Sequence, residues 1–383
     1  MSMLIKNARI VTPDTTFTGV VEVREGLIHA VEEGATQAAG ALDWEGDYLV
    51  PGLVELHTDN LEKHLAPRPG VYWNTHAAFA IHDAQVAAAG ITTVFDSLVI
   101  GERDASGLRS RKLQAECGQA LLDTIAAGLL RADHFLHLRC EVATQDAADT
   151  FADMCDHPLL RLVSVMDHTP GQRQWHDPVL HRQYHERNGK VPDAQWNAML
   201  ADLKAQQEKY AVPHRRSIVE MSRERGLPLA SHDDTSLEHV EEAQRDGVAL
   251  SEFPTTLVAA RAAHRKSIGV IMGAPNVVRG GSHSGNVAAA ELAREDVLDI
   301  LSSDYVPASL LQAAFQLHND HADCGWTLSK AMRTVSWNPA QSAGLTDRGG
   351  IKPGLRADLV RVAVRPGMPP IPRATYMAGQ RIA

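Results

Sequence analysis

The sequence predicts an α/β fold, a (β/α)8 barrel of the TIM type with a small β-sandwich domain built from both ends of the chain. Apolar strand-like runs alternate with helical patterns through the middle of the chain, which is typical of parallel βα units. Both ends instead contain short strand-like segments separated by turn residues. A length of 383 residues fits one barrel with an appended small domain.

We expect the small β-domain to comprise residues 1–52 and 345–383, and the barrel to comprise residues 53–344. The N-terminal segment contains the alternating run IKNARIVT and then VVEVREGLIHAVEEG, which predicts a hairpin turning near Glu25 and Gly26. The C-terminal segment contains GGIKPGLRADLVRVAV and a last strand around Tyr376 to Ile382. A β-rich start and end around an α/β middle favour one composite domain.

Eight apolar runs are the candidate barrel strands, and this number favours a closed barrel over an open sheet. They are residues 53–57, 91–97, 135–141, 160–168, 227–232, 248–253, 268–273 and 298–304. Helical patterns lie between them, for example from His76 to Ala89 and from Leu108 to Ala127.

One segment, residues 169–214, breaks the alternation because it is long, polar and rich in His, Gln and Arg. It could be a surface excursion with a helix of its own from Ala194 to Lys209. It could also be an active-site loop, because it follows the strand that ends at His168 and such insertions usually shape a pocket. We favour the loop.

Composition excludes several classes of function. The formal net charge is −10 and no run is rich in Lys or Arg, so nucleic acid is not an expected partner. No apolar stretch is long enough for a membrane span, and no signal peptide is evident. The four cysteines are scattered, which suits a cytoplasmic protein without disulfides. We therefore expect a cytoplasmic enzyme for a small molecule, in a homo-oligomer.

Metal-binding residue types stand at the carboxyl ends of the predicted strands, where barrel enzymes place their catalytic groups. They are His57, Asp59, Glu141, His168, His232 and Asp304. Each has an ordinary alternative when taken alone. Glu141 could pair with Arg139, Asp233 and Asp234 could cap the helix that follows them, and Asp304 could cap another.

The pattern His57-Thr58-Asp59 is more informative than a single histidine. Side chains two residues apart on a strand share a face, so His57 and Asp59 point the same way. Three histidines and three carboxylates at one rim fit two metal ions rather than a structural zinc site. Zn²⁺, Mn²⁺ and Fe²⁺ accept imidazole and carboxylate together.

The chain resembles the amidohydrolase superfamily, since PGLVELHTD is similar to the motif on the first barrel strand of that superfamily. Within it, the chain closely resembles the branch that acts in the carbon–phosphorus lyase pathway of phosphonate breakdown. The resemblance extends over nearly the whole chain. It is carried by ELHTDNLEKHLAPRP, GITTVFD, HLRCE, VSVMDHTPGQRQ, LASHDD, EFPTT, MGAPNVVRGGSHSGNVAA, ILSSDYVPASLL and NPAQ.

This resemblance implies a role for each candidate ligand. His57 and Asp59 would bind the more buried ion, Glu141 would bridge both ions, and His168 and His232 would hold the second. Asp304 would ligate the first ion and accept the proton of the attacking water. Our strand count places Glu141, His168 and His232 on strands three, four and five, whereas the superfamily often uses four, five and six. A missed strand is therefore one explanation.

Asp59 replaces a neutral histidine of the common motif, so the site carries one more negative charge. A polyanionic substrate then requires cations nearby. The candidates for phosphate contacts are Lys63, His64, Arg68, Arg139, Arg173, Arg279 and His283. The run from Gly280 to Asn286, GGSHSGN, resembles a loop whose backbone N–H groups approach phosphate oxygens. It could also be a flexible turn.

The function that the resemblance implies is hydrolysis of the 5-triphosphate of a ribosyl methylphosphonate. Diphosphate would leave, and the 5-phosphate would keep its methylphosphonate. Two alternatives remain at this point. One is a C–N hydrolase of the same superfamily, such as a cyclic amidase or a deacetylase, because a fold does not fix a reaction. The other is an inactive relative that only assembles.

Overall fold

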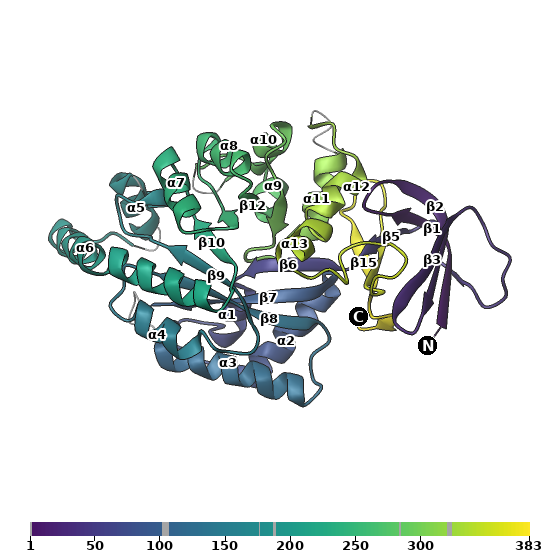
Figure 1. Cartoon of the computed structure of the whole chain (residues 1–383), viewed down its shortest axis with the longest axis horizontal. Helices are drawn as coiled ribbons and strands as arrows, with labels where there is room; N and C mark the ends of the chain where they lie inside the picture. Colours follow the sequence, from purple (N-terminus) through teal and green to yellow (C-terminus); the bar gives the residue numbers. More distant parts are fainter. Residues whose placement is uncertain (1, 102–106, 176, 187–188, 283–284, 320–323) are drawn as a thin grey trace. The chain divides into compact units, whose positions relative to one another are not determined.

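The computed structural model in Figure 1 describes residues 2–101, 107–175, 177–186, 189–282, 285–319 and 324–383. The chain divides into two compact units. Unit 1 comprises Met1–Asp96, Ala120–Phe135 and Ile271–Ala383, and unit 2 comprises Ser97–Gln119 and Leu136–Val270.

The predicted β-sheet from both ends of the chain is confirmed. Its strands pair in one continuous sheet of unit 1 in the order β16-β15-β14-β5-β1-β2-β3, with β4 beside β1. The N-terminal strands, purple in Figure 1, lie beside yellow C-terminal ones because β5 pairs antiparallel with β14. The strands are β1 (Ser2–Val11), β2 (Thr16–Arg24), β3 (Leu27–Glu33), β4 (Leu42–Asp43), β5 (Tyr48–Pro51), β14 (Leu359–Ala363), β15 (Ile371–Met377) and β16 (Gln380–Arg381).

The predicted hairpin turn at Glu25 and Gly26 is confirmed. Both residues have left-handed backbone angles, with φ of 53° and 82°. Two successive residues of this kind form the turn whose twist matches that of the flanking strands. The turn brings β2 and β3 into register, so that their inner side chains join a core around the buried Trp44.

All eight predicted barrel strands are present, and β6 to β13 are neighbours in chain order in one parallel sheet. Glu141 and His232 therefore end strands three and five of the barrel, and His168 follows strand four. Among the described residues the sheet contains no further strand between them. The strands are β6 (Leu53–Thr58), β7 (Ile91–Ile100), β8 (Asp133–Glu141), β9 (Leu160–Met166), β10 (Leu229–His232), β11 (Leu250–Glu252), β12 (Gly269–Gly273) and β13 (Ile300–Ser302).

Helices alternate with these strands. Over the part of the chain that the structure describes, they are α1 (Asn60–Leu65), α2 (Thr75–Ala88), α3 (Arg111–Ala126), α4 (Ala147–Met154), α5 (Pro178–His185), α6 (Asp193–Glu224), α7 (Leu237–Arg245), α8 (Leu257–Arg265), α9 (Ala274–Val278), α10 (Ala289–Arg294), α11 (Ser309–Asn319), α12 (Leu328–Arg333) and α13 (Trp337–Ser342), with a 3₁₀ turn at Arg173–Trp175. Among them, no helix is long and apolar enough to cross a membrane.

The prediction for residues 169–214 needs a correction. The helix expected from Ala194 to Lys209 is the first half of α6, which continues through Pro213 to Glu224. Proline removes one backbone hydrogen bond inside a helix, which makes a helix end the natural sequence prediction. Here the later turns bury Ile218, Val219 and Ser222, so packing keeps the helix continuous.

The two sheets meet at Gly52, between the end of β5 and the start of β6. A side chain at this position would overlap Thr92 and Asp358, so the close approach requires glycine. We propose that the domain boundary lies here, and that residues 345–383 return to the small β-domain.

A buried ionic cluster lies in unit 1. His134 lies between two carboxylates, with Nδ1 2.8 Å from Asp96 Oδ2 and Nε2 3.3 Å from Asp83 Oδ1. Burial works against the charged form, yet Asp96 and Asp83 raise the pKa of His134 to about 9. Burial is likewise outweighed at Asp96, where His134 and His82 lower the pKa to about 2.

These shifts predict how stability depends on pH. The contribution of His134 is complete below its unfolded pKa of 6.5 and is lost as pH rises through about 9. We expect the unfolding free energy of the wild type to exceed that of His134→Gln most clearly near pH 6. The excess should shrink by on the order of 3 kcal/mol by pH 9.5. Urea unfolding of both proteins at the two pH values measures it, and a constant difference would contradict a charged His134.

Candidate metal centre

The first donor cluster lies in unit 1 at the ends of β6 and β13. His57, Asp59 and Asp304 each offer one ligand atom, and the three atoms lie within 4.8 Å of one another. His57 is buried on β6, Asp59 follows that strand directly, and Asp304 comes two residues after β13. The structure thus brings these three predicted ligands together, and their binding of a metal ion stays a prediction.

Backbone hydrogen bonds hold the cluster in place. The N–H of Asp59 donates to the carbonyl of Asp304 at 2.8 Å, and the N–H of Asp304 donates to the carbonyl of His57 at 3.2 Å. The hydroxyl of Thr58 donates to the Asp304 carbonyl at 2.9 Å. Asp304 has a left-handed backbone, with φ of 53°, which is strained for a residue other than glycine. The pairing with β6 maintains this strain.

The side chain of Glu55 connects β6 with the end of β13 through hydrogen bonds. Its carboxyl group is fully buried and accepts the N–H of His57 at 2.6 Å and the N–H of Ser303 at 2.5 Å. Burial raises the pKa of Glu55 to about 8 in spite of these hydrogen bonds. Sequence reasoning missed Glu55, although its spacing of two residues from His57 in VELHTD places both side chains on one face.

The second donor cluster lies in unit 2. His168, His232 and Asp233 offer ligand atoms within 4.8 Å of one another. Asp233 Oδ2 lies 3.4 Å from His168 Nε2 and 3.7 Å from His232 Nε2. Asp233, like Asp304, has a left-handed backbone directly after its strand, with φ of 56°. Strained residues of this kind are concentrated at functional sites.

Carboxylates orient both histidines. Glu141 Oε2 lies 2.6 Å from Nδ1 of His168, and Glu252 Oε2 lies 3.3 Å from Nδ1 of His232. Each Nε2 is thereby turned toward Asp233, which is the usual arrangement of metal-binding histidines. Burial lowers the pKa of His168, but Glu141 and Asp233 outweigh it and raise the pKa to about 9.

The donor set of this cluster fits a divalent cation. Asp233 Oδ2 is buried and makes no hydrogen bond of ordinary geometry. A buried carboxylate is costly unless a cation neutralises it, and here that cation is a protonated His168 or a metal ion in its place. Two imidazole nitrogens face the same atom. The mixture of nitrogen and carboxylate oxygen suits Zn²⁺, Mn²⁺ or Fe²⁺.

Asp233 is a candidate ligand that the sequence prediction treated as a helix cap. The cap of α7 is instead Ser236, whose side chain accepts the N–H of His239. Asp234 is not a cap either, because it is buried and accepts hydrogen bonds from Ser231, Ser251 and Arg173. The repeated acid in LASHDD was the available signal.

Three of the predicted phosphate contacts follow the first cluster in unit 1. Lys63 donates to the backbone carbonyl of Tyr305, the neighbour of Asp304, and its ammonium lies 5.5 Å from the Tyr305 ring centroid. His64 lies one residue further along α1 and is partly exposed. Arg68 is exposed in a turn closed by its bridge to Val71.

The two predicted contacts in unit 2 are buried. Arg173 is 5% exposed and pairs with Asp234 at 2.5 Å and with Glu242 at 2.8 Å. It also donates to the backbone carbonyl of His232 at 3.1 Å. These contacts give Arg173 a role in holding the residues around His232. Arg139 is buried on β8, two residues before Glu141.

The predicted phosphate loop follows α9 in unit 1. Arg279 is exposed at the end of this helix. The side chain of Asn276 ties the base of the loop, because it donates to the carbonyl of Val287 and accepts the N–H of Ala289. Gly280 and Gly285 have left-handed φ angles of 77° and 79°. The predicted contact His283 lies outside the described residues.

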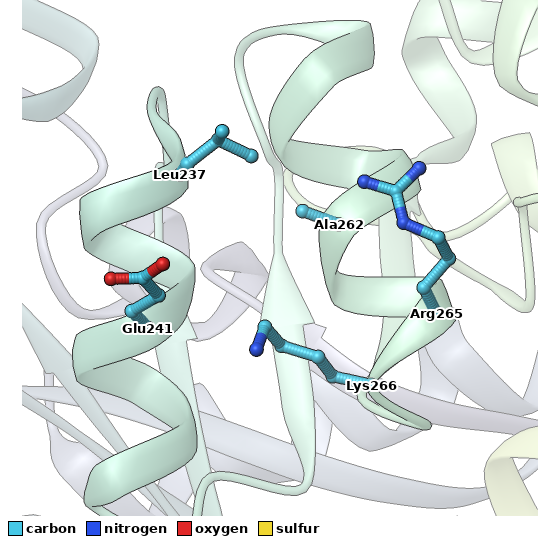
Figure 2. A pocket seen from close by; sticks show the side chains of 5 residues that line it. All are labelled: Leu237, Glu241, Ala262, Arg265 and Lys266. Atoms are coloured by element: carbon cyan, nitrogen blue, oxygen red, sulfur yellow. The ribbon is translucent and has the colours of Figure 1, made fainter.

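A pocket of about 310 Å³ occurs elsewhere in unit 2. Figure 2 shows Leu237 and Glu241 on α7 opposite Ala262 and Arg265 on α8, with Lys266 directly after that helix. None of the candidate ligands lines it.

The parallel barrel of this chain, with histidines and carboxylates after its strands, is typical of metal-dependent barrel hydrolases. The family model described as "Amidohydrolase family" matches residues 198–381 of this chain. A relative from Escherichia coli (strain K12), alpha-D-ribose 1-methylphosphonate 5-triphosphate diphosphatase, is 45% identical over 358 residues, covering 94% of each chain. The chain belongs to the amidohydrolase family and is an enzyme.

Solved structures agree with the fold. N-acetyl-D-glucosamine-6-phosphate deacetylase from Mycobacterium smegmatis matches with a TM-score of 0.64 and 18% identity, covering 100% of this chain and 99% of that one. The 5-methylcytosine deaminase from Klebsiella pneumoniae matches with a TM-score of 0.62 and 16% identity, covering 100% and 98%. At such identities the likeness supports the fold alone.

The second cluster yields a prediction about metal content. Asp233→Asn removes the charge of the buried carboxylate, and we expect the affinity for Zn²⁺ to fall by about 10- to 100-fold. Glu238→Gln is the matched control, because Glu238 is an exposed carboxylate on α7. Competition with a chelator, followed by metal analysis, measures both variants. Equal retention of metal would exclude Asp233 as a ligand.

Proposed function

We propose that this chain hydrolyses alpha-D-ribose 1-methylphosphonate 5-triphosphate to the 5-phosphate and diphosphate, as the name of its Escherichia coli relative describes. The observation that carries the proposal is 45% identity over 94% of both chains. Identity of this extent supports a shared reaction, whereas resemblance of fold alone would not distinguish between reactions.

Each cluster is a proposed ion site by itself: His57, Asp59 and Asp304 form the one in unit 1, and His168, His232 and Asp233 form the one in unit 2. Their donor sets support Zn²⁺, with Mn²⁺ and Fe²⁺ as alternatives. When bound, such ions lower the pKa of water and offset the charge of phosphoryl oxygens. That Glu141 bridges both ions stays a prediction, and its contact with His168 supports an orienting role.

The residues of this chain then divide the reaction between them. Water attacks the α-phosphorus in line with the bond to the β-phosphate oxygen, and that bond breaks as diphosphate leaves. Asp304 accepts the proton of the water, supported by the hydrogen bonds that hold its backbone beside His57. Glu55 fixes His57 and the end of β13 from the buried side.

Cations must offset the substrate's negative charge, because Asp59 and Asp233 add carboxylates to the donor set. We assign this role to Lys63, Arg68 and Arg279, which are exposed in unit 1, together with His64 and His283. The ion pairs of Arg173 with Asp234 and Glu242 favour a structural role for that residue. The buried Arg139 remains a candidate.

The alternative is a C–N hydrolase of the same family. The deacetylase fold supports it only at the level of architecture, at 18% identity. A cytoplasmic location agrees with four free cysteines, and a homo-oligomer stays a prediction from sequence.

The decisive measurement is phosphorus NMR of the metal-loaded enzyme with the ribosyl 5-triphosphate. We expect one diphosphate to appear for each 5-phosphate formed. In Asp304→Asn, the ion at His168, His232 and Asp233 should be retained and turnover should fall by about 10²- to 10⁴-fold, because the proton acceptor is lost. Stepwise release of orthophosphate, or hydrolysis of cyclic amides instead, would reject the proposal. Full turnover of Asp304→Asn would reject that residue's role.

The assignment of Arg279 and Arg173 can be separated by kinetics. Arg279→Ala should raise KM by about tenfold with little change of kcat, because a charge-assisted hydrogen bond to phosphate is lost. Arg173→Ala should instead lower the unfolding midpoint, because it leaves buried Asp234 without its cation. An unchanged KM in Arg279→Ala would remove Arg279 from the site.

A further inference from the structure

A network of hydrogen-bonded polar side chains, most of them buried, connects to the residue that follows Asp59 in unit 1. It begins at the ionic cluster of His134 with Asp96 and Asp83. His82 Nε2 extends it, because this atom lies 2.8 Å from the second oxygen of Asp96. The side chains of these four residues have no exposed surface. No part of the proposed reaction uses them.

Charges within this chain are balanced. Asp83 also accepts the backbone N–H groups of Arg131 and Ala132 and pairs with the Arg131 guanidinium at 2.9 Å. Both nitrogens of His134 face carboxylates, so both carry protons and the ring is cationic. Each carboxylate of the cluster therefore faces a cation.

Asn60 sets the roles of the two nitrogens of His82. Asn60 Nδ2 lies 2.9 Å from His82 Nδ1, and because an amide nitrogen only donates, this Nδ1 accepts. His82 Nε2 then donates to Asp96. Asn60 directly follows the candidate ligand Asp59 and is itself 1% exposed.

The last link reaches His64. Asn60 uses its second N–H on Gln85 Oε1 at 2.9 Å, and His64 Nε2 lies 3.0 Å from the same oxygen. An amide oxygen only accepts, so the proton of His64 is on Nε2. The 3.4 Å approach of Asn60 Nδ2 to His64 Nε2 is no hydrogen bond in this arrangement, because both amide protons are in use.

A metal site at this place is a weaker explanation. His82, Asp96 and His134 do offer three ligand atoms within 4.8 Å. However, the other nitrogen of each ring already faces Asn60 or Asp83. The 2.8 Å separations between rings and carboxylate are hydrogen-bond distances, and protons satisfy every one of them. The cluster is complete without an ion.

We propose that the chain from Asp96 through His82, Asn60 and Gln85 holds His64 in its Nε2–H tautomer and thereby makes Nδ1 the nitrogen that serves the substrate. The inference rests on the proposed function, which gives His64 a phosphate contact. A phosphate oxygen requires a donor, so His64 takes a proton from solvent onto Nδ1 when the triphosphate binds. The hydrogen bond to Gln85 Oε1 meanwhile keeps the proton on Nε2 of His64. His82 is a positioning residue that acts through Asn60.

Imidazole ¹⁵N NMR of the zinc-loaded enzyme tests the tautomer without any turnover. His64 is assigned by comparison with His64→Gln. In the wild type, Nε2 should carry the proton and Nδ1 should show the shift of an unprotonated nitrogen. Gln85→Leu removes the acceptor, and both shifts should move toward the average of the two tautomers. Gln85→Glu keeps an acceptor oxygen and should retain the wild-type pattern.

Variants of His82 test the longer connection. Gln at position 82 can accept from Asn60 and donate to Asp96, so His82→Gln should keep the tautomer, whereas His82→Leu should lose it. Val86→Ala is the matched control, because Val86 is a fully buried apolar residue one turn along α2. A destabilised fold alone should leave the His64 signals unchanged. Gln85 is exposed, so its variants remain informative even where His82→Leu does not fold.

Kinetics with the ribosyl triphosphate complete the test. Gln85→Leu should raise KM by about fivefold with kcat little changed, and Gln85→Glu should restore KM. An Nδ1–H tautomer in the wild type, or an unchanged tautomer in Gln85→Leu, would overturn the proposal. A wild type with the expected tautomer that releases no diphosphate would instead reject the proposed function, because the NMR result does not depend on turnover.

Discussion

The first donor cluster depends on one buried carboxyl group, that of Glu55. It accepts the backbone N–H of His57 on β6 and that of Ser303 at the end of β13, so two strands far apart in the chain share one acceptor. Because both bonds are to backbone, they fix where His57 and Asp304 leave their strands rather than merely restraining side chains. Burial raises the pKa of Glu55 to about 8, so the group is largely neutral at pH 7 and adds little charge beneath the cluster.

A second constraint is common to both clusters. Asp304 and Asp233 each follow a strand in the left-handed conformation, which is uncommon for residues that have a Cβ. The conformation turns the carboxylate out of the strand direction at the point where the chain leaves the sheet. Hydrogen bonds from the neighbouring strand hold each one, through the carbonyl of His57 for Asp304 and that of Glu252 for Asp233. Strain at these two positions is therefore maintained by the sheet.

Polar groups behind the clusters extend this organisation inward. In unit 2, Glu252 contacts His232 and also accepts the hydroxyl of Ser164 at 2.6 Å. In unit 1, the chain from His134 to His64 balances its charges internally. Buried carboxylates are costly unless they are paired, and each of these has a partner. Carboxylates and amides behind the clusters thus orient the histidines in front of them.

The sequence by itself determined the eight barrel strands, their order and five of the residues in the two donor clusters. It could do so because periodicity reports which face a side chain occupies, and parallel strands bring their carboxyl ends to one rim. It could not assign Glu55, whose buried acid resembles any polar residue within a strand, or Asp233, which reads equally well as a helix cap.

Only the tertiary structure decided the partners of the remaining polar residues. His82 lies on α2 and His134 on β8, separated by 52 positions in the sequence, and the carboxylate of Asp96 joins them. Likewise Arg173, predicted to meet phosphate, pairs with Asp234. The physical reason is the same in each case. Local pattern fixes the direction of a side chain, whereas its charge state and role depend on which groups the fold buries beside it.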